Sequence, residues 1–199
     1  MKGAKGRFEI HLTLSSEMRA EALLAHAERL ALTPTFVRLT HGRSTDQPML
    51  TSRVEGDFAS ALARAEELRL ALQARGIATT RTKIEVARVT GAAPYATRGY
   101  LEHHVKVELP ERGVAALQAL CDREGAHLSR NVLAHVADGR VLLFCTQRTA
   151  DPTQTSLADR ALASMVQALT KLDGCVIRDV ENEQVLEDSN LALDAGWSP

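Results

Sequence analysis

Aromatic residues are scarce in this sequence and cysteines are few, and each shortage excludes a class of protein. Phe, Trp and Tyr make up 4% of the 199 residues, too few for the stacking platforms that bind single-stranded nucleic acid. The three cysteines form no Cys-x-x-Cys pair, which fits free thiols in a reducing compartment better than a disulfide framework. We therefore expect a cytoplasmic protein without an RNA-binding sheet.

Long apolar runs and an excess of one charge are also missing. No apolar stretch has the length of a membrane span, and no signal-peptide run follows the basic N-terminus. The net charge of -1 argues against an extended nucleic-acid surface. We expect no membrane association, while 45% hydrophobic residues supply an ordinary globular core.

Two similar series of secondary-structure elements follow one another along the chain. In each, apolar and polar residues alternate as in half-buried strands, and apolar stripes at helical spacing separate the strands. The first series is predicted as a strand at 7–14, a helix from Ser15–Ser16 to about residue 32, strands at 35–40 and 49–54, a helix between Asp57 and Gly76, and a strand at 77–88. The second is predicted as a strand at 100–109, a helix at 110–124, strands at 126–133 and 141–147, a helix at 155–174, and a strand at 175–185.

The two series also agree in individual polar residues. Glu-x-His stands in the first strand of both, as Glu9 and His11 and again as Glu102 and His104. We therefore predict an α+β fold made by tandem duplication of a ferredoxin-like βαββαβ unit, with antiparallel sheets and helices on one face. The predicted parts are a first repeat at 1–90, a linker at 91–99, a second repeat at 100–185, and a C-terminal tail at 186–199 that packs on the fold.

The candidate site is the polar face of these sheets. Helices must cover the apolar face, so Glu9, His11 and Thr13 are left on the open one. In a ferredoxin-like sheet the first strand lies between the third and the fourth. The predicted neighbours of His11 are therefore Arg53, Lys83 and Glu85, and those of His104 are Arg148 and Glu183.

The segment Ile10-His11-Leu12-Thr13-Leu14 resembles the His-x-Thr strand motif of the two-histidine phosphoesterases, the RNA ligase-like cyclic phosphodiesterases. In that family each of two lobes presents one motif to a shared cleft. The resemblance implies that His11 and His104 act as general acid and base on a small nucleotide or RNA end. Lys106 stands where the second motif has Thr or Ser. The implied anion contacts are Thr13, Lys106, Arg53, Arg148 and Lys83, and the implied orienting carboxylates are Glu9, Glu102, Glu85 and Glu183.

Two other functions fit the same residues. The chain would be a non-catalytic module that binds a small phosphorylated or other anionic ligand, or an interaction protein. In the latter, the polar sheet faces would be buried between repeats or between the subunits of a homodimer.

Other patterns are weaker. Glu9, His11 and Glu85 would suit a divalent metal, but no helical His pair or Cys pair accompanies them, and we predict neither metal nor cofactor. Residues 102–106 resemble the Glu-x-Glu-x-Lys strand of triphosphate tunnel enzymes without its second Glu. The loop from His41, with Gly42, Arg43, Ser44 and Thr45, could cradle an anion through its backbone N–H groups, but it is predicted to be a plain connection.

Overall fold

The computed structural model describes residues 5–40, 44–134 and 136–195, so His41–Arg43 of the predicted loop, His135 and Trp197 lie outside the described residues. The first half contains β1 (Gly6–Leu14), α1 (Ala20–Leu30), β2 (Thr33–Leu39), β3 (Asp46–Gly56), α2 (Phe58–Gln73) and β4 (Thr79–Ala87). The second half contains β5 (Tyr100–Pro110), the 3-10 helix η1 (Glu111–Gly113), α3 (Val114–Arg123), β6 (His127–Asn131), β7 (Arg140–Thr149), α4 (Thr155–Leu169), β8 (Val176–Asp188) and the 3-10 helix η2 (Leu191–Asp194).

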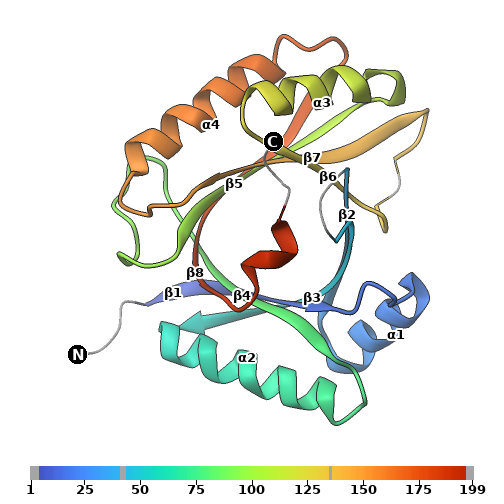
Figure 1. The fold of residues 1–199 in the computed structure, drawn as a ribbon, viewed down its shortest axis with the longest axis vertical. Coiled ribbons are helices and arrows are strands. Elements are labelled where there is room, and N and C mark those ends of the chain that lie inside the picture. The colour runs from blue at the N-terminus through green and yellow to red at the C-terminus, as the bar shows by residue number, and fades with distance from the viewer. Residues whose placement is uncertain (1–4, 41–43, 135, 196–199) are drawn as a thin grey trace.

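The described strands form one closed antiparallel barrel in the order β1-β3-β2-β6-β7-β5-β8-β4 (Figure 1). Within each half the first strand lies between the third and the fourth, as predicted: β1 pairs with β3 and β4, and β5 pairs with β7 and β8. The α+β class and the antiparallel pairing are thereby confirmed.

The halves do not form separate sheets, and that part of the prediction is wrong. β2 pairs with β6 on one side of the barrel, and β4 pairs with β8 on the other. These four strands are the edges that two separate sheets would expose. An exposed edge carries unpaired backbone N–H and C=O groups, and pairing edge to edge satisfies them.

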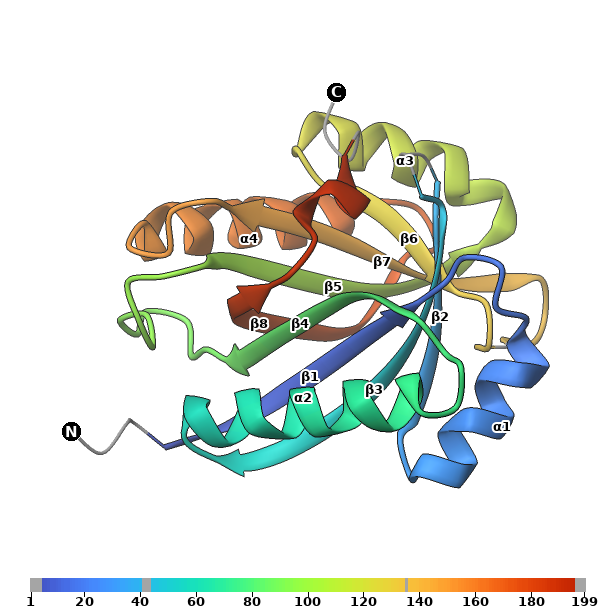
Figure 2. The ribbon, with the colours of Figure 1, turned by 60° about the horizontal axis from the view of Figure 1, so that its bottom comes forward.

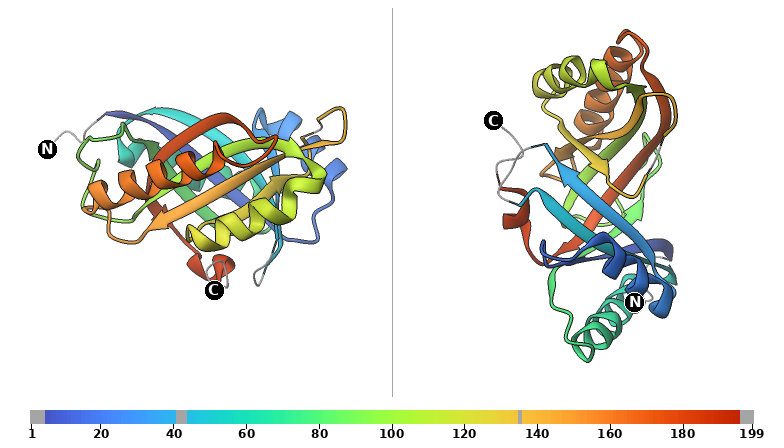
Figure 3. Two further views of the ribbon diagram at one scale, coloured as in Figure 1. Left: turned by 90° about the horizontal axis from the view of Figure 1, so that it is seen from above. Right: turned by 90° about the vertical axis from the view of Figure 1, so that its right-hand side faces the viewer.

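The helices cover the outside of the barrel. Figure 2 shows α2 running along the outer face of β1, β3 and β4, and Figure 3 shows α3 and α4 on the opposite side of the molecule. Each half has its own apolar core between helices and strands. Side chains at the centre of these cores include Phe8, Ile10, Leu68 and Leu72 in the first half and Val105, Val107, Leu117 and Met165 in the second. Because strand side chains alternate, the polar partners of this apolar face point into the barrel.

Helix ends were predicted unevenly. The helix predicted to start at Asp57 does begin there, and Asp57 is its N-cap, since its carboxylate accepts a hydrogen bond of 2.9 Å from the Ser60 backbone N–H. The helix predicted from Ser15–Ser16 instead begins at Ala20, and its N-cap Arg19 makes no side-chain capping bond. No helix in the described residues is long and apolar enough to cross a membrane.

Three leucines of the apolar stripes on the helices are exposed. Leu24, Leu62 and Leu157 are 47%, 40% and 48% exposed. Each lies at the margin of its apolar stripe. A helix that packs on one side against a sheet buries only a narrow stripe, so marginal positions stay in solvent.

Candidate functional site

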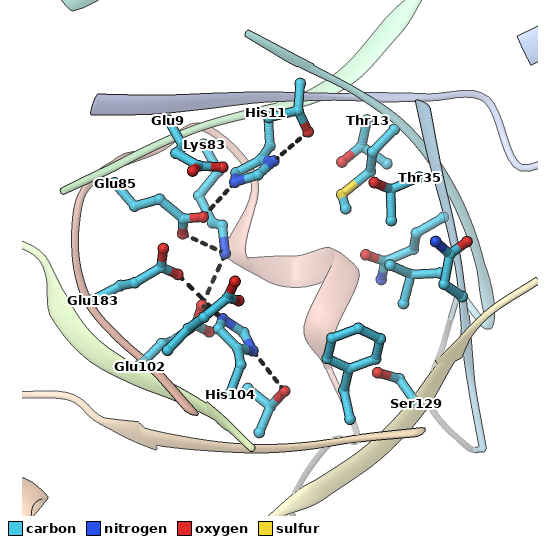
Figure 4. Close-up of a pocket in the computed structure, with 18 of the residues that line it drawn as sticks. Glu9, His11, Thr13, Thr35, Lys83, Glu85, Glu102, His104, Ser129 and Glu183 are labelled. Atoms are coloured by element: carbon cyan, nitrogen blue, oxygen red, sulfur yellow. Dashed lines mark hydrogen bonds and ion pairs between the residues drawn. The ribbon is translucent and has the colours of Figure 1, made fainter. Parts of the chain in front are cut away.

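The interior of the barrel encloses a cavity of about 310 Å³ to which strands of both halves contribute (Figure 4). His11 and His104 both line it, as the sequence hypothesis requires. Among the other predicted site residues, Arg148 is not in the wall but bonds to a wall residue, Glu102. The predicted residues in the wall are Glu9, His11, Thr13, Arg53, Lys83, Glu85, Glu102, His104, Lys106 and Glu183.

His11 lies between a hydroxyl and a carboxylate. Its Nδ1 is 2.8 Å from Thr51 Oγ1, and its Nε2 bonds to Glu85 Oε1. An ionised carboxylate only accepts hydrogen bonds, so Nε2 carries the proton and donates to Glu85. The ring is therefore fixed in orientation from both sides.

His104 repeats this arrangement in the second half. Its Nδ1 is 2.9 Å from Thr146 Oγ1, and its Nε2 lies 3.5 Å from Glu183 Oε2 and 3.6 Å from Glu102 Oε2. Burial alone would lower the pKa of His104, but the carboxylates of Glu102 and Glu183 outweigh it and raise that pKa to about 10. His104 is thus an imidazolium at neutral pH.

Lys83 connects the two histidine sites. Its Nζ lies 2.8 Å from Glu85 Oε2 and 2.8 Å from Glu102 Oε2 (Figure 4). Burial opposes the charge of the ammonium, but Glu102 and Glu85 hold the pKa of Lys83 well above its ordinary value. The result is a continuous chain of contacts from His11 through both carboxylates and the ammonium to His104.

The carboxylates of this chain differ in pKa. Burial would raise the pKa of Glu102, but Lys83 and His104 hold it well below its ordinary value. For Glu183, burial and the neighbouring charge of Glu85 together raise the pKa. Of these two carboxyl groups, Glu183 therefore takes up a proton more readily than Glu102.

Two of the predicted anion contacts are engaged with protein carboxylates. Arg53 donates to Glu9 through Nε at 2.7 Å and through Nη2 at 3.3 Å. Arg148 donates to Glu102 through Nη2 at 2.6 Å. The same Glu-to-Arg pair thus occurs at matching positions of the two halves, and both guanidiniums are neutralised by it.

Lys106 differs from these cations. Its side chain lines the cavity, and its Nζ lies 5.7 Å from the centroid of the Phe144 ring. Within the described part of the chain, no carboxylate lies within ion-pair distance of it. Lys106 thus brings a positive charge to the cavity wall without a counter-ion among the residues that the structure describes.

The two walls of the cavity differ in character. The histidines, Lys83 and most of the glutamates come from β1, β4, β5 and β8. Figure 4 shows them gathered on one side, with Thr35 and Ser129 across the cavity. The opposite wall, from β2, β3, β6 and β7, is mostly neutral and includes Thr33, Thr35, Val37, Leu39, Met49, Ser129, Asn131 and Phe144.

Sequence reasoning missed the hydroxyl partners of both histidines. Thr51 and Arg53 alternate on β3 just as Thr146 and Arg148 alternate on β7, and this repeated Thr-x-Arg pattern was a visible signal. Arg81 was also missed, although it shares the face of β4 that carries Lys83. Arg81 lines the cavity and is ion-paired within the barrel.

The carboxylates and imidazoles do not converge on one point as metal ligands would. Over residues 5–40, 44–134 and 136–195, no group of three or more His, Cys, Asp or Glu side chains has the geometry to hold a metal ion. The cationic partners Lys83, Arg53 and Arg148 occupy the carboxylate oxygens instead.

No protein-family model matches this chain, and no curated protein matches its sequence. The likeness to solved structures is distant. A Fusobacterium nucleatum protein, provisionally named a monooxygenase, is 8% identical with a TM-score of 0.34 and 96% of each chain covered. An anthrone oxidase-like protein is 13% identical (TM-score 0.32, 98% of each chain covered), and a heme-binding protein from Thermus thermophilus is 11% identical (TM-score 0.29, 92% of each chain covered). At these values the likenesses carry no argument about function.

Proposed function

We propose that this protein binds a small anionic molecule inside the barrel. The observation that carries the proposal is the cavity of about 310 Å³ between the two halves, with one charged and one largely neutral wall. Ligand pockets range from roughly 300 to 1,000 Å³ and combine an apolar lining with a few polar groups that fix orientation. A ligand of this kind would be small, with a neutral body and one charged group.

Lys106 is the residue that would bind the charged group. It is the cation that lines the cavity without an ion pair in the described residues, whereas Arg53 and Lys83 already bind carboxylates. The hydroxyls of Thr13 and Ser129 also line the cavity and can donate to an anion. A ligand with one negative charge matches this single open ammonium better than a highly charged one, because the glutamates in the wall repel further negative charge.

Acid/base cleavage of a phosphoester by His11 and His104 stays a second hypothesis. The two imidazoles share one cavity, which supports it. The carboxylate contacts of both Nε2 atoms count against it, because a phosphate oxygen would have to displace Glu85 or Glu183. A pKa of about 10 also keeps His104 from acting as a base near neutral pH. We therefore favour binding over catalysis.

We also infer that the chain arose by duplication of a ferredoxin-like unit. Matching strand registers support this inference. His11 stands opposite Thr51 between β1 and β3, and His104 stands opposite Thr146 between β5 and β7. The remaining matched pairs in those registers are Glu9 with Arg53 and Glu102 with Arg148.

A thermal-shift screen tests the binding proposal. Inorganic phosphate, acetate, succinate and adenosine monophosphate would each be added at constant ionic strength to the wild-type chain, Lys106→Met and Lys171→Met. A ligand that binds the native state raises the Tm. We expect at least one of these anions to raise the Tm of the wild type and of Lys171→Met but not of Lys106→Met.

Lys171 is the matched control because it is an exposed lysine on the loop after α4. Equal responses of both variants would contradict the assigned role of Lys106. If no anion stabilised the wild type, the interaction-protein alternative would be favoured. In that alternative the polar faces of the strands are buried for structural reasons and bind no ligand.

A further inference from the structure

The short helix η2 lies across one mouth of the barrel (Figures 1 and 3). Asp194 is the buried residue of this helix, with a side chain that is 2% exposed, while Leu191 is 54% exposed. The buried anchor of the described tail beyond Asn190 is thus a charged group. An anchor of this kind can be replaced by another group of the same charge.

The Asp194 carboxylate is held by two guanidiniums. Arg81 donates Nη1 to Oδ1 at 2.9 Å and Nη2 to Oδ2 at 2.8 Å, and Arg148 donates Nη2 to Oδ2 at 2.7 Å. The two parallel bonds from Arg81 form the fork that guanidinium groups use to recognise a carboxylate. Asp194 therefore sits as a bound carboxylic acid would.

Residues of the barrel itself hold both guanidiniums in place. Arg81 donates Nε to Asp188 at 2.8 Å, and Asp188 accepts a further bond of 2.6 Å from the Tyr100 hydroxyl. The Arg148 guanidinium lies 4.3 Å from the centroid of the Tyr100 ring, and it donates to Glu102 at 2.6 Å. These contacts do not involve η2, so the arrangement of the two arginines does not depend on the tail alone.

The pair of arginines also adjoins the cavity. Arg81 is part of the cavity wall, and Arg148 bonds to Glu102, which is another wall residue. A molecule lying in the barrel could therefore place an acidic end between the two guanidiniums once Asp194 has left.

We propose that Arg81 and Arg148 form a carboxylate-binding site at this mouth of the barrel, and that Asp194 occupies it in place of a ligand. A molecule with a free carboxylate would compete with the tail for the two arginines. This site is separate from Lys106 and does not depend on an anion binding there.

Rescue of an Asp194→Ala variant tests the proposal. In this variant Arg81 and Arg148 lose their hydrogen bonds to the Asp194 carboxylate. We therefore expect a lower Tm than that of the wild type. Acetate has the missing group, so it should raise the Tm of the variant by about 2–4 °C more than chloride does at equal ionic strength. The Tm of Asp173→Ala, which loses an exposed carboxylate, should show no such difference.

Adding Arg148→Met to Asp194→Ala should abolish the acetate effect. The proposal is overturned if acetate and chloride act equally on Asp194→Ala, or if the acetate effect persists without Arg148. Because inorganic phosphate is tetrahedral, a larger rescue by phosphate than by acetate would also contradict a carboxylate site.

Should Asp194→Ala fail to fold, hydrogen exchange on the wild type takes its place. The amides of Leu193 and Ala195 donate to the Asn190 and Ala192 carbonyls within the tail. Acetate that competes with Asp194 should increase exchange in a peptide covering residues 190–195, relative to chloride, and leave exchange in β1 unchanged. Unchanged exchange in the tail would overturn the proposal.

Discussion

Lys83 of β4 and Glu102 of β5 form an ion pair of 2.8 Å that joins the two halves of the chain inside the barrel. The Glu102 side chain is 0% exposed and that of Lys83 is 14% exposed. The pair links residues that were predicted to belong to different repeats. It is also one link in the series of contacts that runs from His11 through Glu85, Lys83 and Glu102 to His104.

Replacing Lys83 by Met should strongly destabilise the protein. The change leaves Glu85 and Glu102 buried without their shared cation, and breaking a buried ion pair costs about 3–5 kcal/mol. Urea unfolding of Lys83→Met and of the exposed control Lys171→Met measures the difference. A Lys83→Met protein as stable as Lys171→Met would refute the role of this ion pair.

His104 should make stability depend on pH. Its folded-state pKa of about 10 lies above the ordinary value of 6.5. A raised pKa contributes stability in full below pH 6.5, and that contribution is lost as the pH rises through about 10. The free energy of unfolding of the wild type minus that of His104→Gln should therefore fall between pH 6.5 and 10. Unfolding curves at several pH values measure it, and a difference that stays constant would contradict the assignment.

Glu183 should control the pKa of His104. The Glu183 carboxylate lies 3.5 Å from His104 Nε2 and is one of the two groups that raise this pKa. Glu183→Gln keeps the size of the side chain and removes its charge, so the imidazole should titrate at a lower pH. NMR titration of the histidine ring protons would show the change, with Glu111→Gln, an exposed residue of η1 outside the cavity wall, as the control. An unaltered His104 titration in Glu183→Gln would argue against this charge coupling.

Gly99 should tolerate alanine poorly because of a close approach to the β8 backbone. Its φ is +75°, and a Cβ there would lie 1.8 Å from the Val185 carbonyl oxygen. Gly125 has a similar φ of +63° but open space around the same position. Gly125→Ala should cost about 1–2 kcal/mol from φ alone, and Gly99→Ala should cost at least about 2 kcal/mol more. Chemical unfolding compares them, and equal losses would show that the approach to Val185 does not matter.

Local sequence patterns were enough to predict the elements and the polar faces. The alternation around Glu9 and His11 fixes which side chains share a face, because the period of a strand is two residues. The same reasoning applied to Glu102 and His104. The wall of the cavity contains all four residues. The helices cover the apolar face of the strands, so the polar face points into the barrel.

Closure of the barrel could not be predicted from these patterns. It depends on backbone pairing of β2 with β6 and of β4 with β8, where Arg38 of β2 stands opposite Arg130 of β6. Edge strands pair through backbone N–H and C=O groups, which every residue except proline carries in full. The side chains of an edge strand therefore do not indicate which other strand it pairs with. For the same reason the Lys83–Glu102 ion pair was not foreseen.

The tail contact was equally hidden. Asp194 and Arg81 are 113 positions apart in the chain. No sequence pattern around either residue indicates that the two are in contact. Contacts of this kind are set by where the chain emerges from its last strand, and β8 extends to Asp188, three residues beyond its predicted end.

Binding of a small anion inside the barrel can be measured at the two histidines themselves, because both line the cavity. Ring signals of His11 and His104 would be followed by NMR while the anion with the largest thermal shift is titrated. Both signals should move together with a single dissociation constant, because both rings line one cavity. Saturable binding that leaves both signals in place would contradict binding inside the barrel.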